Sequence, residues 1–188
     1  SAHRGRGELP VNLVSRNRWL IVTAIHYLTL FVFSQANTYL SPLGIYILIT
    51  GMLLSFSSLA LSHTQGALSL IPIAFYLDSR SPLPFGTSLI ILIGLHYLTV
   101  GFRHQFRRES GGISLAVSLI ANLAIHILYT LFAIVYLGSE GLNSLKIGLN
   151  LLCTSLVITF LNPYYISLII GILGLFGIKI AQEQRQAR

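Results

Sequence analysis

The sequence predicts an all-α polytopic membrane protein: a compact bundle of six transmembrane helices, the last of them kinked at a proline. Three observations lead to this prediction. The chain of 188 residues is 54% hydrophobic and only 9% charged, whereas soluble domains carry about 25% charged residues. Its apolar residues form runs long enough to cross a bilayer, which takes roughly 20 helical residues. Its basic residues stand in short clusters between those runs, as the positive-inside rule describes.

Polar and turn-forming residues divide the apolar runs. The polar run from Ser62 to Gly66 divides an uncharged stretch that is too long for one upright helix. Two serines and two prolines between Asp78 and Gly86 mark a connector that cannot continue a helix. A glycine pair at 111 and 112 opens the fifth run. The expected spans are therefore 19–40, 43–61, 66–77, 86–102, 111–137 and 147–178.

The third and the sixth spans each contain a proline. Pro72 makes the short third span either kinked or partly outside the bilayer. Asn162-Pro163 interrupts the last run, which is either one kinked helix or a hairpin of two short ones. One helix places ten of the twelve Lys and Arg residues on the side of the termini, whereas a hairpin places only seven there. The positive-inside rule thus favours six spans with both termini cytoplasmic.

The parts outside the spans are expected to be short. Residues 1–18 form a basic cytoplasmic N-terminal tail, 19–180 the transmembrane domain and 181–188 a short cytoplasmic C-terminal tail. A net charge of +7 would also suit nucleic acid. Because the basic residues are split between apolar runs, however, membrane lipids are expected as partners and nucleic acid is not.

The charged residues argue against an intramembrane enzyme. There are five acidic residues, and no Asp, Glu, Lys or Arg lies in the middle of an expected span. Charge buried in a span is tolerated mainly for function. A mechanism with paired carboxylates therefore lacks its second carboxylate. We expect no catalytic residue and no cofactor.

Histidines are the remaining candidates for chemistry. His26, His96 and His126 fall in the first, fourth and fifth expected spans, where three converging imidazoles would bind a metal ion. Their spacing matches no metal-binding motif, and neutral histidines commonly hydrogen-bond between membrane helices. The single cysteine, Cys153, excludes an intrachain disulfide. We expect no metal site.

Glycines seven residues apart mark one face of two expected helices. The pairs are Gly44 with Gly51 and Gly94 with Gly101. Small residues let neighbouring transmembrane helices approach closely. We expect Gly94, Gly101 and Asn122 to pack against other helices of the bundle, with a docking face for a second membrane protein as the alternative.

One stretch carries more specific information than composition does. Ile73-Ala74-Phe75-Tyr76-Leu77-Asp78 precedes Ser81-Pro82-Leu83-Pro84-Phe85-Gly86-Thr87, then an apolar span and then Arg103-His104-Gln105-Phe106-Arg107-Arg108. This order resembles the bacterial rod shape-determining protein MreD family. Residues 118–123 and Pro163 are similar to later parts of the same family, so the resemblance covers residues 19–180. The chain departs from the family pattern in Tyr76, in its basic N-terminal tail and in the apolar tail beyond Pro163.

The resemblance implies a non-enzymatic scaffold subunit of the bacterial cell-elongation complex, which synthesises peptidoglycan in rod-shaped cells. The implied location is the cytoplasmic (inner) membrane. The implied partners are an MreC-like protein and, through it, a RodA-type glycosyltransferase, a class B penicillin-binding transpeptidase and MreB.

Two groups of residues in this stretch are candidates for contacts. The partner-docking candidates are Asp78, Arg80, Pro82, Pro84 and Gly86. A local turn capped by Asp78 explains the same pattern equally well. The cytoplasmic candidates are Arg103, Arg107 and Arg108, which are expected to contact anionic lipid or a cytoplasmic partner.

Two other functions stay open. The MreD family is similar in fold to the substrate-binding subunits of energy-coupling-factor vitamin transporters. That function needs a polar pocket near the outer face, and the residues available to line it are Asn37, Tyr39, Asn122, His126 and Tyr129. A small membrane enzyme acting on lipid is disfavoured by the missing carboxylate pair.

Overall fold

Helices are the only regular structure in the part of the chain that the computed structural model describes, residues 17–103, 111–138 and 143–178. The helices are α2 (Arg18–Leu40), the 3-10 helix η1 (Ser41–Leu43), α3 (Thr50–Ala60), α4 (His63–Asp78), α5 (Thr87–Phe102), α6 (Gly111–Leu137) and α7 (Ser144–Leu175). The prediction of an all-helical fold is confirmed.

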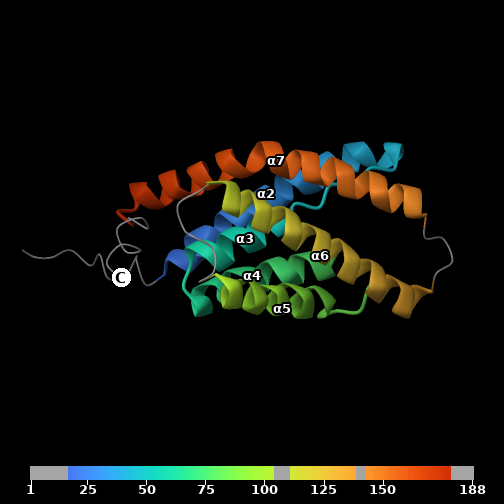
Figure 1. Cartoon of the computed structure of the whole chain (residues 1–188), viewed down its shortest axis with the longest axis horizontal. Helices are drawn as coiled ribbons and strands as arrows, with labels where there is room; N and C mark the ends of the chain where they lie inside the picture. Colours follow the sequence, from blue (N-terminus) through green and yellow to red (C-terminus); the bar gives the residue numbers. More distant parts are fainter. Residues whose placement is uncertain (1–16, 104–110, 139–142, 179–188) are drawn as a thin grey trace, which may run out of the picture.

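The six α-helices run back and forth between the two ends of an elongated bundle (Figure 1). α2 begins and α7 ends at the same end, on the left of Figure 1. α3 lies in the interior, where it packs on α4, on α5 and most extensively on α6. α2 packs on α4, and α7 packs mainly on α6.

α3 is the centre of the core. Every residue from Thr50 to Ser58 is buried, because small and apolar side chains surround this helix on all sides and each side meets another helix. Its largest fully buried side chains are Met52, Leu53 and Leu54. They belong to one cluster with fully buried side chains of the surrounding helices, Ile73, Leu92, Ile125, Ile158 and Leu173.

Within the described ranges, three helical segments are long and apolar enough to cross a bilayer: 18–43, 112–137 and 144–175. α3, α4 and α5 are shorter, with 11, 16 and 16 residues. At about 1.5 Å per residue, a helix of α5's length spans about 24 Å, slightly less than a hydrocarbon core of about 30 Å. The outer surface carries large exposed apolar side chains, among them Ile90, Val135 and Phe160, as a lipid-facing surface does.

The second expected span differs from the structure. A helix was expected from residue 43, but the chain between Gly44 and Ile49 is not helical and α3 begins only at Thr50. Gly44 ends η1 with a positive φ of 70°, a conformation that glycine adopts without strain. Side chains of α2 and α7 then hydrogen-bond the backbone of Tyr46, Ile47 and Leu48, and hydropathy does not measure this contribution to stability.

The break between α3 and α4 comes earlier than expected. It lies at Leu61 and Ser62, so the residues from His63 to Gly66 belong to α4. The Gly66 amide donates to the Ser62 carbonyl at 2.8 Å, which starts the helix one turn before the expected position. Pro72 lies within α4.

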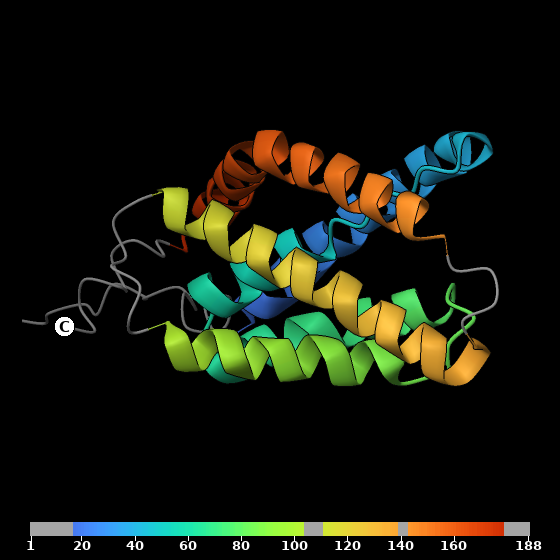
Figure 2. The same cartoon turned by 45° about the vertical axis from the view of Figure 1, so that its right-hand side comes forward.

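α7 is one continuous helix of 32 residues that contains Pro163. The expectation of a single helix rather than a hairpin is confirmed, and Figure 2 shows that its axis bends. Proline removes one backbone hydrogen bond and commonly bends a helix in this way. Asn143 caps the start of α7, where its side-chain oxygen accepts from the amides of Leu145 at 3.0 Å and Lys146 at 3.4 Å.

Candidate functional site

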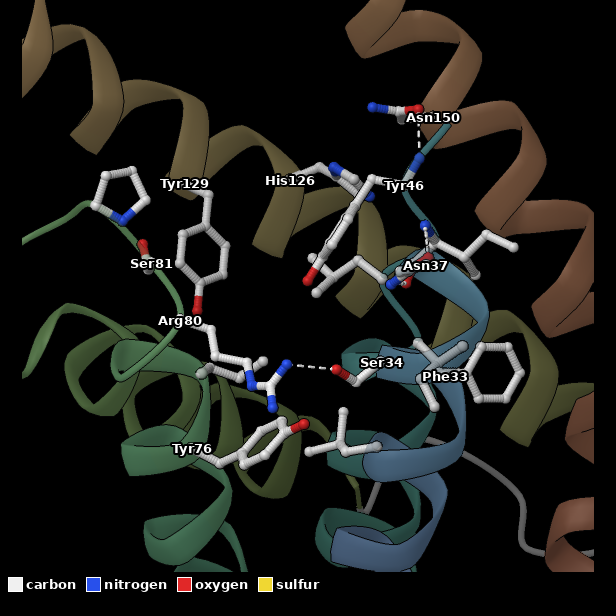
Figure 3. Close-up of a pocket in the computed structure, with 16 residues that line it drawn as sticks. Phe33, Ser34, Asn37, Tyr46, Tyr76, Arg80, Ser81, His126, Tyr129 and Asn150 are labelled. Atoms are coloured by element: carbon white, nitrogen blue, oxygen red, sulfur yellow. Dashed lines mark hydrogen bonds between the residues drawn. The ribbon is translucent and has the colours of Figure 1, made fainter. Parts of the chain in front are cut away.

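A cavity of about 400 Å³ lies near the end of the bundle where α2 ends and α5 begins (Figure 3). Its walls come from α2, the non-helical segment 44–49, the end of α4 and the following connector, α6 and α7. Polar side chains project from every wall: Ser34, Asn37, Tyr46, Tyr76, Arg80, Ser81, His126, Tyr129 and Asn150. A pocket of this size with convergent polar groups is a candidate for a small-molecule site.

Asn37 of α2 fixes the middle of segment 44–49. Its Oδ1 accepts from the Ile47 amide at 2.8 Å, and its Nδ2 donates to the Ile47 carbonyl at 2.9 Å. The side-chain amide of Asn37 thus supplies a hydrogen-bond partner for both the N–H and the C=O of Ile47. The backbone of Ile47 is therefore satisfied although it belongs to neither a helix nor a strand. Backbone that is irregular at membrane depth requires internal partners of this kind.

α7 holds the same segment from the opposite side. The Tyr46 amide donates to Oδ1 of Asn150 at 2.9 Å, and the Leu48 amide donates to Oγ1 of Thr154 at 3.2 Å. The wall of the cavity is therefore set by side chains of the first and the last described helices.

Among the described residues, Arg80 is the only charged one in the lining. Its Nη1 donates to Oγ of Ser34 at 2.7 Å, and its Cζ lies 5.0 Å from the centre of the Tyr76 ring. This is a cation–π arrangement. Figure 3 shows the guanidinium reaching from the connector toward Ser34 of α2. The fold thus holds a positive charge at the cavity.

Asp78 is used within the fold. It is buried, and its two carboxylate oxygens accept from the amides of Gly86 at 2.7 Å and Ser88 at 2.8 Å. These amides belong to the N-terminal end of α5, where a carboxylate is favoured. Gly86 has a φ of 98°, which glycine adopts readily. The Asp78 carboxylate therefore faces inward, as in the alternative of a capped turn.

The other members of the predicted docking set belong to the same connector, and two of them, Arg80 and Pro82, also line the cavity. Arg80, Pro82 and Pro84 are exposed, and Gly86 is half-buried. The structure therefore separates a buried anchor, Asp78, from the residues of the connector that a partner is able to reach.

The predicted packing residues also divide into two groups. Asn122 is fully buried at the contact of α6 with α3. Gly94 and Gly101 are exposed, and a Cβ added at either would meet no atom within 4 Å. The structure places neither glycine against another helix of the bundle. The close approaches are instead at Gly51, where a Cβ would lie 2.5 Å from Asn122, and at Gly66, where it would lie 2.6 Å from a backbone oxygen of α3.

Arg103 is the only member of the predicted cytoplasmic group in the described residues, since Arg107 and Arg108 lie outside them. Its Nη1 donates to the Leu61 carbonyl at 3.0 Å and lies 3.5 Å from the Ser58 carbonyl. These carbonyls are at the C-terminal end of α3, where a cation is favoured. Arg103 thus ties the end of α5 to the end of α3.

His26 and His96 cross-link helices in the interior. Nε2 of His26 lies 2.8 Å from Oγ of Ser57, and its other ring nitrogen hydrogen-bonds the hydroxyl of Tyr165. Nδ1 of His96 lies 2.8 Å from Oγ of Ser58. Within the described ranges no three His, Cys, Asp or Glu side chains come together as metal ligands.

His126 faces the cavity instead. Its Nε2 is buried and has no hydrogen-bond partner within the described part of the chain. Asn37, His126 and Tyr129, three of the five residues predicted to line a ligand pocket, do line the cavity. Tyr39 is 81% exposed, and Asn122 lies at the α3–α6 contact instead.

Sequence reasoning missed six of the nine polar residues that line the cavity: Ser34, Tyr46, Tyr76, Arg80, Ser81 and Asn150. Asn150 carries a detectable signal, since it is a polar side chain inside the uncharged run 147–178. Tyr46 carries none, because its position depends on the loss of helix before Thr50.

Comparisons with known proteins found no matching family model, characterised protein or solved structure. The likeness to the MreD family therefore rests on the quoted residues alone. In the described part of the chain these fall mainly on the end of α4 and the following connector, with residues 118–123 in α6 and Pro163 in α7.

Proposed function

We propose that this protein is a non-enzymatic scaffold subunit of the bacterial cell-elongation complex, bound to an MreC-like partner in the cytoplasmic membrane. Through that partner it would join a RodA-type glycosyltransferase, a class B penicillin-binding transpeptidase and MreB. The observation that carries the proposal is the connector between α4 and α5. The stretch with the MreD-like sequence folds there as one ordered unit around Asp78.

The connector is held rigid from inside. The hydroxyl of Thr87 donates to the Pro84 carbonyl at 2.7 Å, and the Leu83 amide donates to Oγ of Ser81 at 3.2 Å. Leu83 is buried, and each proline fixes its own φ. A surface that is already ordered loses little conformational entropy when a partner binds, which favours affinity.

An aromatic pair gives this surface an apolar anchor. Phe85 is 71% exposed and stacks on Phe75 of α4, with 5.5 Å between ring centres and 7° between planes. Aromatic side chains are enriched at protein interfaces. Phe75 and Phe85 are therefore the residues on which the partner contact would centre.

Phe85→Ala should weaken recovery of the MreC-like partner and round up rod-shaped cells of the source organism, because it removes the exposed anchor without opening the core. Phe160→Ala is the matched control: Phe160 is 70% exposed but lies on α7. Both variants are to replace the chromosomal copy, and cell shape and co-purified partner are scored at equal membrane protein level. Normal rods and full partner recovery with Phe85→Ala would remove the support for docking at the connector.

The proposal includes six membrane crossings with both termini cytoplasmic. In that arrangement Arg18 and Arg103 are on the cytoplasmic side, and Arg80 and Lys146 are on the outer side. With Cys153 replaced by serine, a membrane-impermeant thiol reagent added outside should label a cysteine at exposed Ser79 and leave one at exposed Asn17 unlabelled. Labelling at residue 17 in intact cells would contradict this topology.

The cavity favours a second candidate function, that of the substrate-binding subunit of an energy-coupling-factor vitamin transporter. Asn37, His126 and Tyr129 are placed as that function requires. Saturable binding of riboflavin, thiamine or biotin would support it, and these compounds are included among the probes of the experiment below.

A further inference from the structure

A second hollow of about 250 Å³ adjoins the cavity, between the connector, α6 and α7. The two hollows share five lining residues, Ser81, Pro82, His126, Tyr129 and Asn150. They therefore lie directly next to each other, close enough for one elongated ligand to reach into both. Figures 1 and 2 show that α6 and α7 diverge toward this end of the bundle.

The two ends of this site differ in polarity. Beyond the shared residues, the second hollow is lined by Leu83, Ala133, Leu137 and Ile147, with Thr130 as the one polar side chain. The cavity end carries Arg80 and the tyrosines. A ligand that fills both ends needs a polar head and an apolar tail.

Arg80 determines the charge that suits the head, because among the described residues it is the only charged one that lines either hollow. One guanidinium nitrogen donates to Ser34, and the carboxylate of Asp78, two residues earlier, is engaged with the amides of Gly86 and Ser88. Guanidinium groups bind carboxylate and phosphate oxygens through parallel hydrogen bonds. An anionic head is thus the chemical match.

Neighbouring polar groups suit the same head. The Tyr76 hydroxyl and Nε2 of His126 are both buried, and neither has a hydrogen-bond partner within the described part of the chain. Buried polar groups in folded proteins are normally hydrogen-bonded. Asn150 uses its Oδ1 for the Tyr46 amide, so its Nδ2 is left to donate. A phosphate or carboxylate supplies the acceptor oxygens that these groups lack.

We propose that this site binds an anionic amphiphile, with its phosphate or carboxylate on Arg80 and its hydrocarbon chain in the groove between α6 and α7. A neutral amphiphile would offer no negative charge to Arg80. A small anion without a hydrocarbon chain would not fill the apolar groove. The proposal is independent of the scaffold function, since it requires no MreC-like partner.

The test uses the purified full chain in a neutral detergent, with native mass spectrometry and thermal unfolding as readouts. The probes are dodecyl phosphate, dodecanol, inorganic phosphate, riboflavin, thiamine and biotin. Dodecyl phosphate should give one saturable adduct and raise the unfolding midpoint. Dodecanol, which loses the charge-assisted hydrogen bond, and inorganic phosphate, which loses the apolar contact, should each bind roughly ten-fold or more weakly.

Two variants locate the site. Arg80→Gln should reduce the affinity for dodecyl phosphate roughly ten-fold or more, whereas Lys146→Gln, which changes another basic residue at the same end of the bundle, should leave it unchanged. Ala133→Phe should also reduce binding because the larger ring fills the groove, and it leaves Arg80 in place.

Several results would overturn the proposal. Unchanged binding in Arg80→Gln and in Ala133→Phe would show that the amphiphile binds elsewhere. Inorganic phosphate that binds as well as dodecyl phosphate would exclude a role for the groove, and equal binding of dodecanol would exclude a role for the charge. Saturable binding of a vitamin in place of dodecyl phosphate would assign the cavity to the transporter function. None of these results changes the interpretation of the Phe85→Ala experiment, so either proposal can be rejected without rejecting the other.

Discussion

One added methyl group at Gly51 should destabilise the whole bundle. A Cβ there would lie 2.5 Å from the backbone nitrogen of Asn122 and 2.6 Å from the Ser118 carbonyl oxygen. Both are backbone atoms of α6, so no side-chain rotation relieves the overlap and α3 must move away from α6. Overpacking of this kind costs about 1–3 kcal/mol. The cost falls on the most extensive helix–helix contact of the fold.

Gly94→Ala is the matched control for Gly51→Ala. It adds the same methyl group to a helix, but at a position where nothing lies within 4 Å. Because alanine raises helix propensity in both variants, the difference between them isolates the steric effect. Thermal unfolding in one detergent, followed by size-exclusion chromatography, measures that difference. Equal midpoints for the two variants would mean that α3 and α6 are not in the close contact described here.

Asp78→Ala should also be strongly destabilising. It removes both acceptors of the amides of Gly86 and Ser88 at the start of α5. A buried donor that loses its acceptor costs about 1–3 kcal/mol, and two are affected. Asp78→Asn keeps one carbonyl oxygen and should fall between alanine and the wild type. The loss should appear as a lower unfolding midpoint and as faster amide hydrogen exchange in the first turn of α5.

Ser79→Ala is the control for Asp78→Ala. The Ser79 side chain is exposed and gives up only its hydrogen bond to the Tyr76 carbonyl, so its midpoint should stay close to that of the wild type. If Asp78→Ala is as stable as the wild type but no longer binds the MreC-like partner, the carboxylate acts in docking. Its hydrogen bonds to the start of α5 then contribute nothing measurable to stability.

The helices that follow clear local signals could be predicted from the sequence. α5, α6 and α7 lie within three residues of the expected spans 86–102, 111–137 and 147–178, because glycine, proline and charged residues bound each apolar run. The choice of one helix through Pro163 came from counting charges, which is a property of the whole chain.

The unwound segment before Thr50 could not be predicted. Residues 44–49 are as apolar as a membrane helix, and their backbone partners Asn37, Asn150 and Thr154 stand on other helices. Hydropathy measures the free energy of transferring a side chain out of water. It does not include the hydrogen bonds that backbone groups form with distant side chains. The cavity was missed in part for the same reason, since this segment forms one of its walls.

The face on which a helix packs was equally hidden. In a soluble protein the apolar side of a helix marks the core, but in a bilayer both the core side and the lipid side are apolar. The seven-residue spacing of Gly94 and Gly101 therefore showed only that they share a face. The contact of Gly51 with Asn122 depends on the register between α3 and α6, which spacing within one helix does not determine.

The support of segment 44–49 by α7 also sets the order in which the protein matures during biosynthesis. The acceptors of the Tyr46 and Leu48 amides lie 104 and 106 positions later in the chain. While α2 to α6 leave the ribosome and enter the membrane, Asn150 and Thr154 have not yet been inserted. A nascent chain that stops before Ser144 thus lacks both acceptors and one wall of the cavity. The cavity is complete only after α7 has been synthesised and has packed against segment 44–49.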